Sequence, residues 1–276
     1  MVLNISMRYI IAGFIAVFGI SLVSTAHAQP EPIKTAREAV IESIEKLDAL
    51  KRDETIDPIE RMKRETELKR EALTNIIELS TLETENIREK LEDIEVTLAF
   101  EDFRIELVQA TNGYVKYFDA AQNLLKGTES LDGIQTIAGQ LKDWRILTYD
   151  PGIAKAVDLV LVFQNREALD IADQRFEKLS IELRRRAVRI RQSWQPLLLR
   201  ASGDLDEAHR LNEAAIELLN EYLPKDEAAA TEENTLAEVE SEVVSDHTVR
   251  KFVEGSITKV KEAYGKFISL SDFLKR

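Results

Sequence analysis

Two histidines lie beyond the N-terminal segment of this 276-residue chain, His209 and His247. Imidazole is the commonest metal-binding side chain, and His209 and Glu213, four residues apart, lie on one helix face as half of a metal site. The chain contains neither an H-E-x-x-H string nor the paired E-x-x-H motifs of di-iron bundles. We therefore predict no metal site and no cofactor, and we interpret His209 as a solvent-facing side chain.

Two other strings suit group-transfer chemistry but lack the motifs that must accompany them. Ser256 and Lys259 have the S-x-x-K spacing of a serine nucleophile and its lysine, but no K-T-G or S-D-N string is present. Residues 206–209 read DEAH, yet no phosphate loop of the GxxxxGK[ST] type exists. We interpret the first pair as ordinary helix residues and the DEAH string as the first turn of a helix. The sequence thus predicts no catalytic residues and a protein that is not an enzyme.

The densest basic cluster has two interpretations. It consists of Arg184, Arg185, Arg186, Arg189 and Arg191. Arginines this close together spread around several faces of a helix, where they pair with glutamates and lie favourably near a helix C-terminus. This structural role is the one we favour. The alternative is a site for an anionic envelope polymer or a lipid head group.

The N-terminal residues have the composition of an export signal. Arg8 precedes an apolar run, Tyr9–Val23, which ends before the small-x-small string Ala26–Ala28. We predict a cleaved signal peptide over residues 1–28 and an extracytoplasmic location, periplasmic or secreted. The alternative is an uncleaved membrane anchor, because the segment just spans a thin bilayer.

Composition indicates long helices and excludes several classes of protein. The chain has no cysteine, so it forms no disulfides and no thiolate or cysteine-based zinc site. It has 37 basic and 50 acidic side chains, and loss of Arg8 with the signal peptide makes the net charge −14. A chain this acidic does not bind nucleic acid over its whole surface. Only 10 glycines and 6 prolines interrupt it, which is typical of long helices.

The stretch Pro151–Trp194 is the predicted central helix. Its apolar or small residues follow steps of four and three, which marks one helix face. They are Ala168, Ala172, Phe176, Leu179, Leu183, Ala187, Ile190 and Trp194. The segment Ala156–Phe163 is apolar on almost every side, so we expect it to lie in the core of a bundle. Trp144, Tyr149 and Trp194 are expected to close the ends of that core; the alternative is the wall of a ligand pocket.

Capping motifs divide the rest of the chain into helices. A capping box predicts that the first helix starts at Thr35 and ends near Arg52. Asp57-Pro58 predicts the start of the second, which runs to Gly127 as one helix or as two kinked near Ala99–Asp102 or Gly113. We expect these helices to pair as a hairpin whose tip lies at Asp53–Asp57.

Further breaks are predicted nearer the C-terminus. A helix over Leu131–Leu147, with Leu147 facing inward, should end in a turn at Tyr149–Pro151. A capping box at Asp204–Glu207 predicts a new helix that runs to Tyr222. Residues 224–242 read as an acidic flexible linker. Residues 243–276 form an amphipathic helix that must dock on the bundle, on another copy or on a partner.

Together these patterns predict an all-α fold: an elongated helical bundle with long helices and a coiled-coil-like antiparallel hairpin arm. Residues 29–223 form this bundle, between the signal peptide and the linker. The long stripes and the absence of a catalytic constellation favour a structural or interaction protein, an adaptor or scaffold of the bacterial cell envelope. Its partner is another protein or a second copy bound through helical stripes, with peripheral envelope contact as a further use. The alternative is an extracytoplasmic module that binds a small molecule or anionic polymer.

Overall fold

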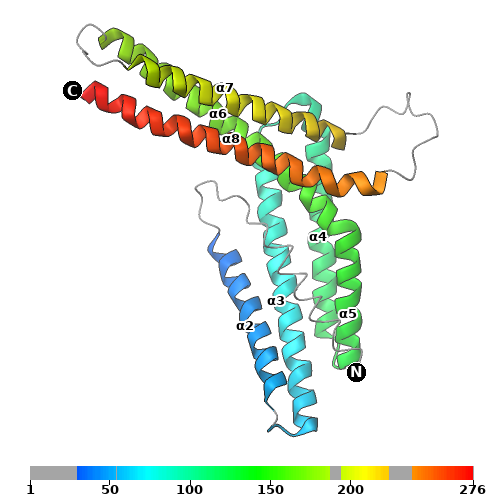
Figure 1. The fold of residues 1–276 in the computed structure, drawn as a ribbon. Helices are drawn as coiled ribbons and strands as arrows, with labels where there is room; N and C mark the ends of the chain where they lie inside the picture. The colour runs from blue at the N-terminus through cyan, green and yellow to red at the C-terminus, as the bar shows by residue number, and fades with distance from the viewer. Residues whose placement is uncertain (1–29, 54, 187–193, 224–237, 276) are drawn as a thin grey trace, which may run out of the picture. The chain divides into compact units, whose positions relative to one another are not determined.

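The computed structural model describes residues 30–53, 55–186, 194–223 and 238–275. Of these residues, 93% are helical and none is in a strand, which confirms the all-α prediction (Figure 1). The predicted signal peptide, Arg189 and Arg191 lie outside the described residues. The elements are α2 (Glu31–Arg52), α3 (Pro58–Asp93), α4 (Leu98–Lys126), α5 (Leu131–Trp144), a π-helical turn (Arg145–Tyr149), α6 (Asp150–Arg186), α7 (Gln195–Leu219), a 3-10 turn (Asn220–Tyr222) and α8 (Glu238–Lys275).

The helices divide into two compact units. Unit 1 comprises the described residues up to Glu92 together with Ile105–Ala154. Unit 2 comprises Asp93–Arg104 and the described residues from Lys155 onward. Helices α4 and α6 therefore each contribute to both units. This division was not part of the sequence prediction, which had one bundle over residues 29–223.

In unit 1, α2 and α3 form the predicted antiparallel hairpin (Figure 1). Arg37 Nη2 donates to Glu83 Oε1 at 2.9 Å, and nearer the tip Lys46 Nζ donates to Glu71 Oε1 at 3.1 Å. Between these pairs Asn75 Nδ2 donates to Ser43 Oγ at 2.7 Å. The partner numbers fall on α3 as they rise on α2, so the two helices are antiparallel.

Both starts of the hairpin helices were predicted from capping, and one prediction was wrong. Asp57 Oδ1 accepts hydrogen bonds from the backbone of Ile59 and Glu60, as an N-cap should. Helix α2, however, begins at Glu31 and not at Thr35, because a proline at its first turn needs no backbone donor. The Thr35 hydroxyl instead donates back to Glu31 O at 3.0 Å.

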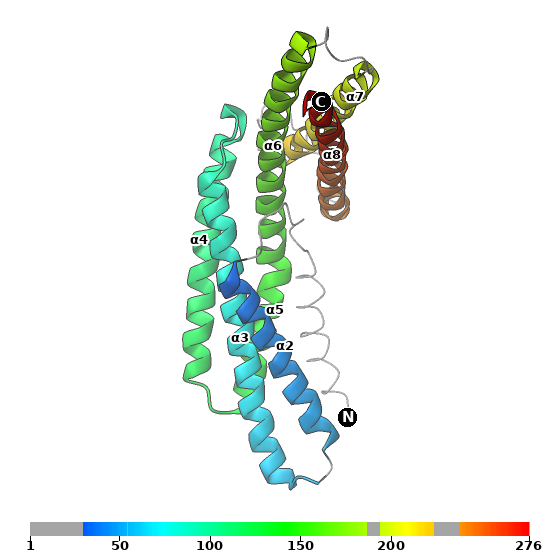
Figure 2. The same cartoon turned by 90° about the vertical axis from the view of Figure 1, so that its left-hand side faces the viewer.

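The second and third helices meet in a reversal, not in a kink. Helix α3 ends at Asp93 and α4 begins at Leu98, just before the first predicted position, Ala99–Asp102, and well before the second, Gly113. Arg88 Nη1 donates to Asn112 Oδ1 at 3.0 Å, and Arg70 Nη2 donates to Thr128 O at 2.6 Å, so α4 runs back along α3 (Figure 2). Leu98, the first residue of α4, is 95% exposed. Gly113 lies inside α4.

Helix α5 returns along α4 and completes an up-down-up-down four-helix bundle. The rings of Tyr117 on α4 and Trp144 on α5 stack with centroids 3.8 Å apart. The core of this bundle includes Val40, Ile77 and Phe118 from the other three helices. The base of the hairpin thus belongs to the bundle, and a smaller cluster around Leu47 and Ala72 holds its outer part.

The predicted turn at Tyr149–Pro151 is absent, because α5 continues through the π-turn into α6 (Figure 2). Proline in a helix lacks an N–H and its ring collides with the carbonyl four residues earlier. The wider π-turn, in which Asp150 N bonds to Arg145 O, accommodates it. The extra residue also rotates the helix face, so Arg145 and Tyr149 are buried while Leu147 is 79% exposed. The expected inward position of Leu147 was wrong for this reason.

In unit 2, α7 runs antiparallel to α6 and α8, and α6 and α8 are parallel. His209 on α7 contacts Asp173 on α6, while Asn212, farther along α7, bonds to Asn165, earlier on α6. The segment Ala156–Phe163 is buried throughout, as predicted. Ala168, expected on the buried stripe, is exposed, and Leu169 beside it is fully buried. Helix α8 begins at Glu238, inside the segment 224–242 that was read as a linker; residues 224–237 lie outside the described part.

The helix predicted to begin at Asp204 is the interior of a longer one. Helix α7 starts at Gln195, with Pro196 in its first turn, and passes through Gly203 without a break. Ala201 and Leu205 on either side of this glycine are buried against α8. Their packing outweighs the cost of about 1 kcal/mol for glycine in a helix. The DEAH string therefore is not a helix start, and Glu207 pairs with Arg210 at 2.7 Å.

Limited proteolysis should test the hairpin tip. Among the residues that the structure describes, we expect trypsin to cut first after Lys51 or Arg52, because both side chains are exposed at the end of α2 beside a short turn. Cleavage after Arg88 should be much slower, since this residue lies within α3 and bonds to Asn112. Mass spectrometry of the early fragments gives the order. Earlier cutting at Arg88 would contradict the hairpin.

Candidate functional site

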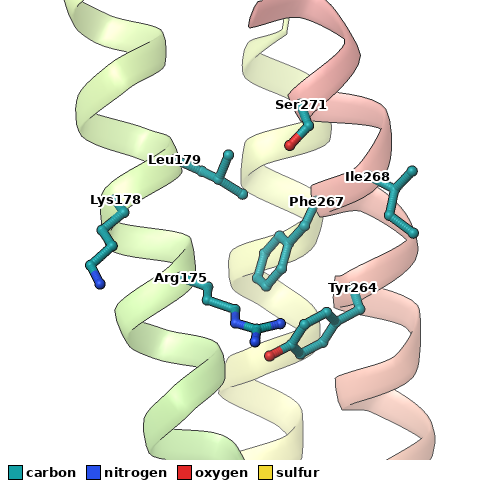
Figure 3. Close-up of a pocket in the computed structure, with 7 residues that line it drawn as sticks. All are labelled: Arg175, Lys178, Leu179, Tyr264, Phe267, Ile268 and Ser271. Carbon is teal, nitrogen blue, oxygen red and sulfur yellow. The ribbon is translucent and has the colours of Figure 1, made fainter.

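A groove between α6 and α8 is the strongest candidate site in the described part of the chain. It has a volume of about 350 Å³ and is hereafter the α6–α8 groove. Its lining residues are Arg175, Lys178 and Leu179 from α6, and Tyr264, Phe267, Ile268 and Ser271 from α8. Figure 3 shows Leu179 and Phe267 pointing into the space between the two helices. All seven belong to unit 2.

The groove has an apolar floor that rests on the core of unit 2. Phe267 is only 4% exposed and belongs to a cluster with Ala172, Ala201 and Leu205. Phe176 supports it from α6, with ring centroids 6.1 Å apart. The place of Phe176 on the apolar stripe suggested a fully enclosed core residue. The structure shows instead that Phe176 is half-buried. The reason is that α7 covers one side of the α6–α8 pair and leaves the groove side open.

The wall and rim are cationic and partly apolar. The Arg175 guanidinium lies 5.2 Å from the centre of the Tyr264 ring, which stabilises it by a cation–π contact (Figure 3). Neither Arg175 nor Lys178 forms an ion pair with a carboxylate among the described residues. Ile268 is 67% exposed on the opposite rim. The groove can therefore hold a group that combines apolar surface with negative charge.

The described members of the arginine cluster are surface residues at the end of α6. Arg184, Arg185 and Arg186 are exposed. Arg186 Nε lies 2.7 Å from Glu182 Oε1, and Arg185 lies 3.7 Å from the same carboxylate. Arg186 also donates to Leu274 O, so it fastens the ends of α6 and α8. Ion pairs of this kind are what the structural interpretation of the cluster expects. The α6–α8 groove lies two turns earlier on α6.

His209 has a partner that the sequence pattern did not suggest. Its Nε2 lies 2.8 Å from Asp173 Oδ2 on α6, so the side chain is half-buried against a neighbouring helix. Within the described residues, no group of three or more histidine and acidic side chains is placed to hold a metal ion. His247 lies where side chains are not described.

Ser256 is part of a buried polar network and is not paired with Lys259. Asn165 Nδ2 donates to Ser256 Oγ and to Asn212 Oδ1, both at 2.8 Å. Ser256 Oγ donates in turn to Ala208 O at 2.8 Å. Lys259 Nζ instead donates to Glu262 on the surface. The S-x-x-K residues are thus not arranged as nucleophile and base, and the network fixes the register of α6, α7 and α8.

A second cluster, of aromatic rings, lies in unit 1. Trp144 contacts Tyr114, Tyr117, Phe118 and Tyr149, with ring centroids between 3.8 and 5.7 Å apart. At Gly152 a Cβ atom would overlap the Tyr114 hydroxyl, so any larger residue there would force the Tyr114 side chain to shift. These rings fill the bundle interior, and Trp194 packs in a separate cluster of unit 2. The three aromatic residues predicted to close one core therefore belong to two different cores, Trp144 and Tyr149 to that of unit 1 and Trp194 to a cluster of unit 2.

A largely buried acid, Glu83, lies beside this cluster. Glu83 accepts a hydrogen bond from Arg37, but its Oε2 is buried without a hydrogen bond. Burial is the main cause that raises the pKa of Glu83 to about 7, against the lowering effect of Arg37 and Arg145. Burial also raises the pKa of Tyr149, although its hydroxyl lies 3.0 Å from Thr84 Oγ1. The pKa of Glu83 thus lies near neutral pH.

Glu83→Gln should therefore alter how stability depends on pH. The folded-state pKa of Glu83 lies above its unfolded value of 4.5, so the folded state binds the proton more tightly. Its stabilising contribution is complete below pH 4.5 and is lost as the pH rises through about 7. We expect the glutamine variant to be more stable than the parent by roughly 1–3 kcal/mol at pH 8 and nearly equal to it at pH 4.5.

Urea denaturation at both pH values measures this difference. Glu78→Gln, a change of an exposed acid on the same helix, is the matched control and should have little effect at either pH. A Glu83→Gln variant that is less stable at pH 8 would show that the ion pair with Arg37 outweighs desolvation.

No protein-family model, curated protein or solved structure matches this chain. Within the described residues, no helix combines the length and apolar character needed to cross a bilayer.

Proposed function

We propose that this chain is an exported interaction protein, an adaptor or scaffold of the bacterial cell envelope, and that unit 2 receives a protein partner in the α6–α8 groove. The observation that carries this proposal is the composition of the groove. A tyrosine, an arginine and an exposed isoleucine, Tyr264, Arg175 and Ile268, surround a buried phenylalanine. Tyrosine, arginine and apolar side chains around a desolvated centre are the usual energetic focus of protein interfaces.

The architecture supports the same proposal. Helix α7 covers one side of the α6–α8 pair. The opposite side, which carries the groove, is open to a further helix. The export prediction rests on Arg8, the apolar run Tyr9–Val23 and the string Ala26–Ala28. An envelope adaptor needs such export and such a docking face, and it needs no catalytic group.

Site-specific photocrosslinking in intact cells tests the proposal. A photoreactive amino acid at Ile268 or at Ser271 should give the same discrete adduct with an envelope protein, because both positions line the groove. Placed at Leu199 on α7, which is 76% exposed, or at Leu124 on α4, which is 61% exposed, it should not give that adduct. Absence of an adduct at both groove positions, or the same adduct at the controls, would refute docking in this groove.

A further inference from the structure

We propose that the occupant of the α6–α8 groove is an acidic amphipathic helix of a partner protein, an inference that rests on the proposed function. Such a helix would lay its apolar face on Phe267 and Leu179 and its carboxylates beside Arg175 and Lys178. It would pack beside α6 and α8 on the side that α7 does not cover.

The spacing of the lining residues fits a helix. On α8 the residues Tyr264, Phe267, Ile268 and Ser271 follow steps of three, one and three, so they form one ridge along about two turns. On α6, Arg175, Lys178 and Leu179 form the facing ridge. Two parallel ridges of this kind leave a groove that a third helix fills with residues spaced by three and four.

The charge of the groove selects an acidic occupant. Arg175 and Lys178 have no carboxylate partner among the described residues, and Lys261, one turn before Tyr264 on α8, is exposed on the same side. These cations belong to a chain whose net charge is −14 once the predicted signal peptide is removed. An acidic helix would be attracted to them, whereas a basic helix would meet like charges.

The same charge argues against a second copy of the chain as the occupant. Two processed molecules, each with a net charge of −14, repel one another as whole molecules, whereas a short acidic helix in the groove meets the nearby cations. A small amphiphile fits less well than a helix, because small-molecule sites bury most of the ligand surface. Here the side chain of Ile268 is 67% exposed, and both Arg175 and Lys178 are exposed, so the groove is open along its rim. A helix covers an open groove of this shape.

Binding of model peptides to the purified protein tests the inference. The protein is expressed from the full-length chain and is used in the form that the expressing cell produces. The acidic probe is a fluorescent helix of about 20 residues, roughly 30 Å long, with leucines spaced by three and four and glutamates beside them. The basic probe replaces each glutamate with lysine. Fluorescence anisotropy should show that the acidic probe binds at least about tenfold more tightly and that its affinity falls with salt.

Charge reversal of the groove gives the decisive comparison. Arg175→Glu with Lys178→Glu should weaken binding of the acidic probe about tenfold or more and should make the basic probe the tighter ligand. Arg166→Glu with Lys251→Glu is the matched control, since both residues are exposed on the same two helices outside the groove. This control should leave both affinities within about twofold of the parent. Circular dichroism of each variant establishes that it is folded.

Other outcomes overturn the inference. Equal affinities of the two probes, or an acidic probe that binds the charge-reversed groove unchanged, would show that an acidic helix is not the occupant. Displacement of the acidic probe by laurate at submillimolar concentration, with a loss of laurate binding in the charge-reversed variant, would assign the groove to an amphiphile instead. If the probes fail but crosslinking at Ile268 and Ser271 still captures one envelope protein, the docking function stands and only the class of helix is wrong.

Discussion

Phe118→Ala is expected to destabilise unit 1 by roughly 3–5 kcal/mol, the usual cost of removing an aromatic side chain from a packed core. Phe118 is fully buried. Its ring meets Trp144 and Tyr149 edge-on at 5.4 and 5.2 Å. Alanine removes these contacts and leaves a cavity that three helices cannot close, because their positions are set by the hairpin and the π-turn.

Urea denaturation followed by circular dichroism measures this loss. Leu124→Ala on the same helix is the matched control, because Leu124 is 61% exposed and its truncation should cost under about 0.5 kcal/mol. Phe176→Ala in unit 2 should fall between the two, since Phe176 is half-buried. Equal losses for Phe118→Ala and Leu124→Ala would mean that the aromatic cluster does not hold unit 1 together.

Asp158→Ala is expected to destabilise unit 2 by about 3–5 kcal/mol, because it removes one partner of a buried ion pair. The Asp158 side chain is fully buried, and its Oδ1 lies 3.1 Å from Arg250 Nε. The Tyr222 hydroxyl donates to its Oδ2 at 3.2 Å. Alanine removes this carboxylate from a guanidinium that is largely buried, so part of the cost of its desolvation is no longer offset.

Two further variants separate the ion pair from simple loss of packing. Glu207→Ala breaks the exposed pair with Arg210 and should change the stability of unit 2 little, because solvent screens that pair. Asp158→Leu combined with Arg250→Met replaces both charges by apolar groups and should recover most of the stability lost in Asp158→Ala. A double variant that is as unstable as Asp158→Ala alone would show that the pair stabilises unit 2 beyond its own desolvation.

Sequence patterns predicted correctly those features that depend only on neighbouring residues. A helix start depends on a few consecutive residues, so Asp57-Pro58 could be identified directly, and its hydrogen bonds to Ile59 and Glu60 confirm it. The buried face of α8 was likewise readable, and Val249 and Val253 are almost fully buried. The hairpin followed from two adjacent helices joined by a short turn, which must pack against one another to bury their stripes.

Where the patterns misled, tertiary packing outweighed local preference. Gly203 and Asp204 suggested a boundary, yet α7 continues because Ala201 and Leu205 are buried against α8. Pro151 suggested a turn, yet the π-turn at Arg145–Tyr149 carries the helix through. In each case the stabilisation comes from residues on other helices, and no window of sequence contains them.

The candidate site divides in the same way. Tyr264 and Phe267 belong to the apolar face that the sequence predicted for the last helix. Arg175 and Lys178 could not be identified from the sequence, because the basic residues are denser at the end of α6. The sequence by itself determined that this protein is helical and which faces of its helices are apolar, because the period of an α-helix is a property of neighbouring residues. Only the tertiary structure decided that α6 and α8 lie in parallel and that Asp158 meets Arg250, because such pairings depend on how separate helices bury one another's surfaces.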